Sequence, residues 1–314
     1  MSTITVPQYL NLQEDCYALH QAFKGIGCDE KRVISILGHR TQAQRLAVAD
    51  AYHRQFGEIL SHRLKSELHN NLERAMLLWM MDAAERDAVL LHESISGLGT
   101  KDTALIGIVC TRTPSQLYII KQAYYNLYHR TLEHAVDGDT SGNYQKLLLA
   151  LLKGNRSEIL GVDRQLAMAD AHALYKAGEG RLGTNEDTFI HILATRSAAH
   201  LTTVSQYYLQ AFGHSLEKAI QKETSGHFEN ALLAVVQATC FPPRYFAQEL
   251  YKSMIGVGTN DSSLIRVITT RAEIDMLYIK GEFSSMYNKT LEHMIAGDTS
   301  GNYKHFLLTL VGGA

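Results

Sequence analysis

Four segments of this 314-residue chain align with one another without gaps. They read KGIGCDEKRVISILGHR, SGLGTKDTALIGIVCTR, GRLGTNEDTFIHILATR and IGVGTNDSSLIRVITTR, and they end at Arg40, Arg112, Arg196 and Arg271. The glycines that they share, Gly27, Gly99, Gly183 and Gly258, are 72, 84 and 75 residues apart. Self-similarity at a nearly fixed period indicates that one structural unit is repeated along the chain and that neighbouring units stack.

Each repeat has the pattern of several short helices. Apolar residues recur at spacings of three and four, as in Val33, Ile34 and Leu37, which is the period of a helix and not the period of two expected for a strand. Only four prolines occur, and three of them lie at the start of the chain or near the last repeat, so long stretches are free to be helical. We therefore predict an all-α fold.

The repeat boundaries divide the chain into six parts. We expect a short N-terminal head at 1–11, repeats at 12–82, 83–153, 166–238 and 241–312, and a linker at 154–165, where the step between the repeats is longest.

The charge balance limits the partners of the chain. Hydrophobic residues make up 46% and charged residues 20%, as in an ordinary folded protein. The formal net charge of −2 provides no basic field, so binding to nucleic acid is not expected. An anionic membrane could be bound only through a cation between the two surfaces.

The cysteines and the N-terminal residues favour a cytoplasmic protein. Cys16, Cys28, Cys110 and Cys240 are far apart and form no CxxC, so neither a disulfide framework nor a zinc site is indicated. The first residues, MSTITVPQYL, lack a basic segment followed by an apolar run, and no apolar stretch is long enough to cross a bilayer. We expect a protein that binds membranes peripherally.

Each glycine loop is followed by a helix start and, later, by an acid. After the second glycine comes Thr100, Thr184, Thr259 or, in the first repeat, Cys28, and we expect this residue to cap the next helix. Cys28 is the poorer cap, so the first loop is expected to be less firmly held. An acidic residue stands 39 positions after the cap in every repeat, as Glu67, Asp139, Glu223 or Asp298.

This pairing of loop and acid suits calcium. A tight glycine loop can turn backbone carbonyls outward, because glycine tolerates the positive φ angles required. Three such carbonyls and one bidentate carboxylate supply five oxygens, whereas calcium takes about six to eight. A phosphate oxygen could complete the shell, which would couple calcium binding to the binding of acidic phospholipid. One GxGT motif alone would be weak evidence, but four glycine loops, each with an acid at the same distance, are hard to explain by coincidence.

The tip of each loop is apolar. The residues are Ile26, Leu98, Leu182 and Val257. Packing against a neighbouring helix and shallow insertion among lipid headgroups are equally consistent with the sequence.

Two other motifs fail. Asp137, Asp139, Ser141 and Gly142 match the first half of an EF-hand loop, but its twelfth position is Leu148 where a bidentate glutamate is required. The chain contains no GxxxxGK[ST] phosphate-binding loop.

The fourfold pattern of glycine loop, acid and Thr-Arg resembles the annexin family over nearly the whole chain, from about Leu12 to Leu310. The resemblance implies four five-helix repeats in a curved disc, whose convex face carries the calcium loops and binds acidic phospholipid membranes. LLWMMDAAERDA around Trp79, together with the contexts of Cys110 and Cys240, is similar to the plant-type branch.

The resemblance also implies the calcium ligands of each repeat. They are the carbonyls of Phe23, Gly25 and Gly27 with Glu67 in the first repeat, Ile95, Gly97 and Gly99 with Asp139 in the second, and Met254, Gly256 and Gly258 with Asp298 in the fourth. The third loop, AGEGRLGT, is longer and resembles a variant form that would use Gly178, Arg181 and Gly183 with Glu223.

Other residues have structural or redox interpretations. The recurrent arginines are expected to tie loop or helix-end carbonyls. The plant-type resemblance suggests a redox role for Cys110 and Cys240. Without further evidence, however, a cysteine of this kind is expected to be a buried and unreactive thiol. The resemblance also suggests weak peroxidase activity through His39, but one histidine at a helix end provides no haem pocket, and we do not expect an enzyme.

An alternative function is a calcium-modulated helical scaffold for cytoskeletal proteins such as actin. It would bind calcium without lipid dependence. Ion conduction ranks low because no segment spans a membrane. We expect a monomer in solution that can self-associate on membranes.

Overall fold

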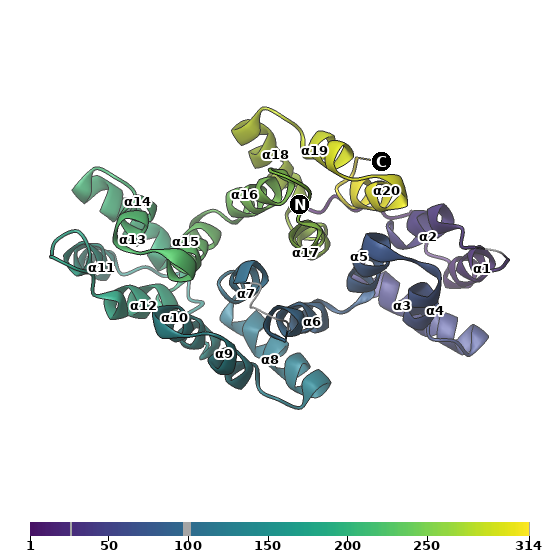
Figure 1. Cartoon of the computed structure of the whole chain (residues 1–314), viewed down its shortest axis with the longest axis horizontal. Helices are drawn as coiled ribbons and strands as arrows, with labels where there is room; N and C mark the ends of the chain where they lie inside the picture. The colour runs from purple at the N-terminus through teal and green to yellow at the C-terminus, as the bar shows by residue number, and fades with distance from the viewer. Residues whose placement is uncertain (26, 97–101, 314) are drawn as a thin grey trace. The chain divides into compact units, whose positions relative to one another are not determined.

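The computed structural model describes residues 1–25, 27–96 and 102–313, and in these ranges the chain forms twenty helices and no strand (Figure 1). The predicted all-α class is confirmed, with five helices in each repeat. Contacts divide the chain into two units, Met1–Arg86 with Phe246–Ala314 and Asp87–Tyr245. The first unit therefore joins the first and last repeats, and the second unit contains the two middle ones.

The first unit is built from ten helices in its described part. In the first repeat they are α1 (Leu12–Ala22), α2 (Glu30–Leu37), α3 (Gln42–Phe56), α4 (Leu60–Glu67) and α5 (Asn70–Met80). In the fourth they are α16 (Pro242–Met254), α17 (Asp261–Arg271), α18 (Met276–Tyr287), α19 (Leu291–Asp298) and α20 (Gly301–Leu310). Helix α20 packs on α2 and α5, and α17 also packs on α5, so the two repeats share one core.

The N-terminal segment is tied to the fourth repeat. The amide of Thr3 donates to the carbonyl of Ala272 at 3.0 Å, and its hydroxyl donates to the carbonyl of Leu310 at 2.6 Å. Both ends of the chain thus belong to the first unit.

The core of the first unit contains a fully buried arginine. The guanidinium carbon of Arg45 lies 3.4 Å from the ring centre of Trp79, and Nε donates to the Trp79 carbonyl at 2.8 Å. Nη2 pairs with Glu273 of the fourth repeat at 2.9 Å. Burial lowers the pKa of Arg45 to about 10, while the charge of Glu273 opposes this shift. An ion pair therefore links the two repeats in addition to their apolar packing.

The second unit contains the helices of the middle repeats. The second repeat forms α6 (Ala83–Ile95), α7 (Asp102–Val109), α8 (Pro114–Tyr128), α9 (Leu132–Asp139) and α10 (Gly142–Leu152). The third forms α11 (Arg164–Ala177), α12 (Glu186–Thr195), α13 (Ala198–Phe212), α14 (Leu216–Glu223) and α15 (Gly226–Cys240). Helix α10 packs on α12 and α15, and α15 packs on α7.

A stacked ring pair fixes the end of each first helix. The rings of His20 and Phe56 are 4.0 Å apart, and the aligned pairs His92–Tyr128, Tyr175–Phe212 and Tyr251–Tyr287 are 3.7, 4.0 and 3.7 Å apart. Each pair joins the first helix of a repeat to the third. Because the stack lies about one turn before the glycine loop, it gives the loop a fixed starting point.

The arginine that ends each aligned segment binds a carboxylate. In the first repeat, Nε and Nη2 of Arg40 donate to the two oxygens of Asp15 at 2.7 and 2.6 Å. The same pairing joins Arg112 to Asp87 and Arg196 to Asp170. In these three repeats the arginine has a structural role as expected, but its main partner is an aspartate of the first helix and not a carbonyl, because a buried guanidinium needs a charge to balance it. Within the described ranges, no helix has the length and apolarity needed to cross a membrane.

Candidate metal-binding loops

The loop between the first and second helices closes in the same way in three repeats. The residue before the second helix donates its amide to a carbonyl of the first helix. Asp29 donates to Ala22 at 2.9 Å, Asn185 to Ala177 at 2.7 Å and Asn260 to Ser253 at 2.8 Å. The chain between these bonds forms a short closed loop.

The glycines of these loops have backbone angles that favour glycine. Gly25 and Gly27 have φ of +102° and +87°, and Gly256 and Gly258 have +104° and +82°. A Cβ at any of the four would meet no atom within 4 Å. Glycine is therefore required at these positions by the backbone conformation and not by a lack of space for a side chain. The first and fourth loops share one conformation at these positions.

The residue that follows the second glycine does not cap the helix as expected. The caps are Asp29, Asn185 and Asn260, one residue later, and their side chains accept from the amides of Arg32, Thr188 and Ser263 at 3.0, 3.3 and 3.1 Å. Asparagine and aspartate cap at least as well as threonine, so the threonine is released for another contact.

That contact joins the loop to the distant acid. The hydroxyl of Thr259 lies 2.7 Å from Oδ2 and 3.0 Å from the carbonyl oxygen of Asp298. The hydroxyl of Thr184 lies 3.1 Å from Oε2 and 3.0 Å from the carbonyl oxygen of Glu223. Since each acid ends the fourth helix of its repeat, the hydroxyl fixes the carboxylate beside the loop. The structure thus brings loop and acid together in the third and fourth repeats.

The third loop lies against its acid directly. A Cβ on Gly178 would be 3.0 Å from Cγ of Glu223, a tight contact, so a larger residue here would push against the Glu223 side chain. Gly183 has φ of +77°, and the amide of Arg181 donates to the carbonyl of Gly178 at 3.1 Å. Gly178, Arg181 and Gly183 therefore lie within one short loop segment, and Glu223 lies beside this segment at the end of α14.

The first loop uses a different contact. Nη2 of Arg63, on α4, donates to the carbonyl of Phe23 at 2.9 Å and pairs with Oε1 of Glu67 at 3.1 Å. Cys28 stands where the third and fourth repeats have threonine. Burial, followed by the charge of Glu67, raises the pKa of the Cys28 thiol to about 11. In the first repeat, therefore, Arg63 joins the loop to Glu67, whereas a threonine of the loop does so in the third and fourth repeats.

The second loop is described only at its edges. Ile95 is a buried residue at the end of α6, and Asp139 ends α9. The assigned residues Gly97, Leu98 and Gly99, as well as Ile26 of the first loop, lie outside the described residues.

The two described loop tips are fully exposed. The exposed fraction is 101% for Leu182 and 109% for Val257. Packing against a neighbouring helix is therefore not the role of these side chains. Met254, by contrast, is buried before the loop and anchors its start.

The donors present fit a hard cation. In the described ranges no three His, Cys, Asp or Glu side chains gather at a point. A metal ion in these loops would take most of its ligands from backbone oxygens and one carboxylate, which are the donors that calcium prefers.

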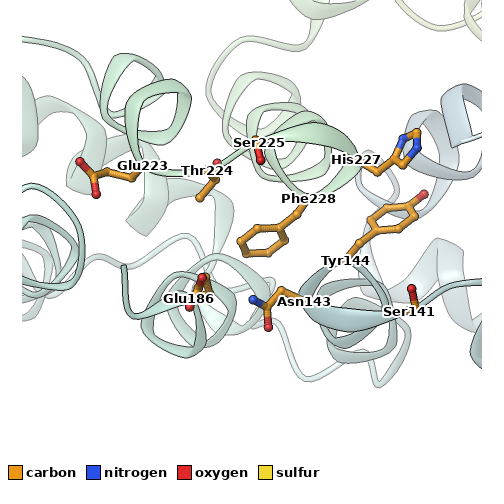
Figure 2. A pocket seen from close by; sticks show the side chains of 9 residues that line it. All are labelled: Ser141, Asn143, Tyr144, Glu186, Glu223, Thr224, Ser225, His227 and Phe228. Carbon is orange, nitrogen blue, oxygen red and sulfur yellow. The ribbon is translucent and has the colours of Figure 1, made fainter. Parts of the chain in front are cut away.

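A polar cavity of about 410 Å³ lies beside the third loop in the second unit (Figure 2). Phe228 points from α15 toward Asn143 of α10 and Glu186 of α12, while the carboxylate of Glu223 points away from Phe228. The lining residues are Ser141, Asn143, Tyr144, Glu186, Glu223, Thr224, Ser225, His227 and Phe228. Glu223, whose carboxylate is held by Thr184 at the loop, thus lies where the cavity adjoins the candidate metal site.

The four loops recur within a known repeat. A family model described as Annexin matches residues 14–79, 86–151, 169–235 and 245–310. The chain belongs to the annexin family. Annexin A8 of Mus musculus is 44% identical over 305 residues, which cover 97% of this chain and 93% of the relative. It is an animal protein, so this comparison does not support the plant-type branch indicated by the residues around Trp79.

Solved annexin structures resemble the chain throughout. Annexin III superimposes with a TM-score of 0.96 at 39% identity, covering 99% of this chain and 97% of that one. A calcium-bound annexin (Sm)1 gives a TM-score of 0.89 at 28% identity, covering 99% and 93%. Annexins are calcium-dependent phospholipid-binding proteins and are not typically enzymes. Calcium is the ion expected for a member of this family.

Residues with redox or peroxidase interpretations have structural contacts. Nδ1 of His39 lies 2.8 Å from the hydroxyl and 3.0 Å from the carbonyl oxygen of Thr5, so this histidine holds the N-terminal segment. Complete burial raises the pKa of Cys110 to about 12, and burial also raises the pKa of Cys240, whose Sγ lies 3.6 Å from the hydroxyl of Ser205. Both cysteines are free thiols. Thiols with raised pKa are poor nucleophiles, which favours the inert interpretation.

Two functional contacts were missed from the sequence. One is the bond from Thr184 or Thr259 to the acid, and the other is the contact of Arg63 with Phe23 and Glu67. The 39-residue spacing contained the first signal, because it relates the threonine itself to the acid. The second signal was Arg63 itself, because the first repeat alone has a cation four residues before its acid.

Proposed function

We propose that this annexin docks on acidic phospholipid membranes through calcium ions that bridge its loops to lipid phosphates. The observation that carries the proposal is the contact of Thr259 with Asp298 and of Thr184 with Glu223, which fixes a carboxylate beside a glycine loop whose tip is fully exposed.

The ligand count explains why lipid takes part. In the fourth repeat the carbonyls of Met254, Gly256 and Gly258 and the carboxylate of Asp298 would hold the ion. The third repeat would use Gly178, Arg181 and Gly183 with Glu223. Five oxygens leave one or two places of the calcium shell open, and a phosphate oxygen is a suitable ligand for them. Calcium and lipid would then each raise the affinity for the other.

The first and second loops complete the proposed set. In the first, Phe23, Gly25, Gly27 and Glu67 are assigned, and in the second, Ile95, Gly97, Gly99 and Asp139. Two of these loops belong to each unit of the fold. Several weak sites acting together bind a surface far more tightly than one of them does.

Charge makes the calcium ion necessary. The formal net charge is −2, so the chain as a whole is not attracted to an anionic surface. The bound ions supply the positive charge locally, and the exposed tips Leu182 and Val257 add apolar contact with the headgroup region. Ile26 and Leu98 are assigned the same role. We place this binding at the cytoplasmic face of membranes when calcium rises, because the four cysteines are unpaired thiols.

Cosedimentation with vesicles tests the proposal. The vesicles contain phosphatidylserine or only phosphatidylcholine, and each is offered with calcium or with a chelator. We expect binding only to the phosphatidylserine vesicles with calcium, and release by the chelator. The double variant Asp298→Asn, Glu223→Gln should require much more calcium, whereas Asp50→Asn, in an exposed ion pair on α3, should behave as the wild type.

Two other results of this experiment would contradict the proposal. Failure to bind the acidic vesicles at millimolar calcium contradicts the proposal and favours the scaffold alternative with a protein partner such as actin. Binding that is independent of calcium contradicts the bridging mechanism.

A further inference from the structure

The first loop differs from the others in the helix that carries its acid. Four residues before Glu67 stands Arg63, whereas the aligned residues are Ala135, Ala219 and Met294. Residues four apart lie on one face of a helix, so Arg63 is directed toward the same loop as Glu67. The sequence places a cation at this position in the first repeat alone.

The guanidinium contacts two oxygens assigned to calcium. Nη2 of Arg63 lies 2.9 Å from the carbonyl oxygen of Phe23 and 3.1 Å from Oε1 of Glu67. Its guanidinium carbon lies 5.8 Å from the Phe23 ring centre, a distance at which a cation and a ring attract each other. Calcium binds oxygen at about 2.3–2.6 Å. The nitrogen therefore occupies the space between two ligands that calcium would need.

The arginine replaces a contact that the first repeat lacks. In the third and fourth repeats a threonine hydroxyl donates to the acid, and the first repeat has Cys28 at that position. A thiol is a weak donor. Arg63 therefore supplies both the donor and a positive charge to the Glu67 carboxylate.

We infer that Arg63 is an internal cation that holds the first loop at low calcium and competes with calcium for Phe23 and Glu67. The inference rests on the proposed function, because it requires loops of this type to hold calcium. Calcium would repel the guanidinium and compete with it for the same two oxygens, so the guanidinium must turn away before calcium enters. The Arg63 side chain is 36% exposed, which leaves it a path to solvent or to a lipid phosphate. The first loop therefore fills at higher calcium than the fourth, whose glycines have the same conformation.

The matched variant is Arg63→Met, because methionine occupies the aligned position in the fourth repeat. In lipid-free protein, calorimetric titration with calcium should show one site whose affinity rises about tenfold, the effect of losing a charge-assisted hydrogen bond in a partly exposed pair. The gain should disappear in the double variant Arg63→Met, Glu67→Gln. Arg54→Met, which breaks an exposed ion pair with Asp50 on α3, should leave the titration unchanged.

A second measurement uses no calcium. Amide hydrogen exchange of the segment 22–29 should be faster in Arg63→Met than in the wild type, because the loop loses the bond to Phe23. The rate in the aligned segment of the fourth repeat should not change. Far-ultraviolet circular dichroism establishes that each variant remains folded.

The outcomes separate the inference from the function on which it rests. If the wild type binds calcium at the fourth loop, as shown by loss of that site in Asp298→Asn, and Arg63→Met changes neither the titration nor the exchange, the inference about Arg63 is wrong and the proposed function stands. If neither the wild type nor Arg63→Met binds calcium, both are overturned.

Discussion

Arg271 lies over the ring of Phe246, with its guanidinium carbon 4.3 Å from the ring centre. Phe246 occupies the position at which the other repeats have Asp15, Asp87 and Asp170. Arg271 instead binds Asp275, four residues later, with Nε 2.8 Å from Oδ1. The fourth repeat therefore keeps the arginine and takes its carboxylate from the turn after α17. The carboxylate thus comes from different positions in different repeats, but each of these arginines has one. This indicates that the fold requires the charge of the guanidinium to be compensated.

This difference predicts unequal costs for removing the carboxylate. Asp87→Asn leaves the buried guanidinium of Arg112 without a full counter-charge and should lower the free energy of unfolding by roughly 3 kcal/mol. Asp275→Asn should cost less, because Arg271 keeps its contact with the Phe246 ring. Urea unfolding followed by circular dichroism measures both. Equal losses in the two variants, or a similar loss in the exposed control Asp50→Asn, would contradict this explanation.

Asp170 predicts a dependence of stability on pH. Burial alone would raise the pKa of Asp170, but hydrogen bonds from Arg196 and His200 outweigh burial and hold the pKa below its ordinary value. A group whose pKa is lower in the folded state stabilises the fold fully above its unfolded pKa, about 3.9. This contribution is lost as the pH falls through the lower folded value. The stability difference between wild type and Asp170→Asn should therefore be large at neutral pH and shrink below about pH 4. A difference that stays constant across an acid titration would show that the pair does not act through charge.

The hydroxyl of Thr259 should tune the calcium site that we propose in the fourth repeat. Thr259→Val keeps the shape of the side chain but removes the donor that fixes Asp298, so the calcium affinity of this loop should fall about fivefold, the value of one ordinary hydrogen bond. Calorimetric titration measures the change. Thr202→Val, which removes a hydroxyl bonded to its own helix on α13, is the control and should leave calcium binding unaltered. A fivefold loss in the control as well would mean that the effect is not local.

The exposed loop tips should add to membrane affinity without contributing to the fold. Leu182→Ser and Val257→Ser together should weaken calcium-dependent binding to phosphatidylserine vesicles by about tenfold while leaving thermal stability unchanged, because both side chains are fully exposed. Leu160→Ser alters another leucine, 86% exposed and outside the loops, and should change neither property. If the tip variant binds vesicles as well as the wild type, membrane insertion of these residues is excluded.

The helical repeats could be predicted because many residues encode them redundantly. The period of the apolar positions, the scarcity of proline and the fourfold alignment all gave the same answer, and an error at one position would not have changed it. The acids could be paired with their loops for the same reason, since the spacing of 39 recurs in every repeat.

Contacts between single side chains could not be predicted in this way. Thr184 and Asn185 are adjacent and both can cap a helix, so the sequence does not tell which residue caps and which turns to Glu223. The partner of Arg40 is 25 residues earlier on another helix. Arg63 had the pattern of an ordinary surface residue, and only the path of the chain from α4 back to Phe23 gives it a second contact.

The division of the chain into units has a consequence for synthesis. The second unit, Asp87–Tyr245, is continuous, whereas the first is completed only when Phe246–Ala314 joins Met1–Arg86. On the ribosome the middle of the protein can therefore fold while the first repeat still lacks its partner. Helices α2 and α5 must wait for α20, which is synthesised after the whole of the second unit. Until then their apolar faces remain open to chaperones and to other nascent chains, so the risk of misassembly is greatest in the interval between the synthesis of α5 and that of α20.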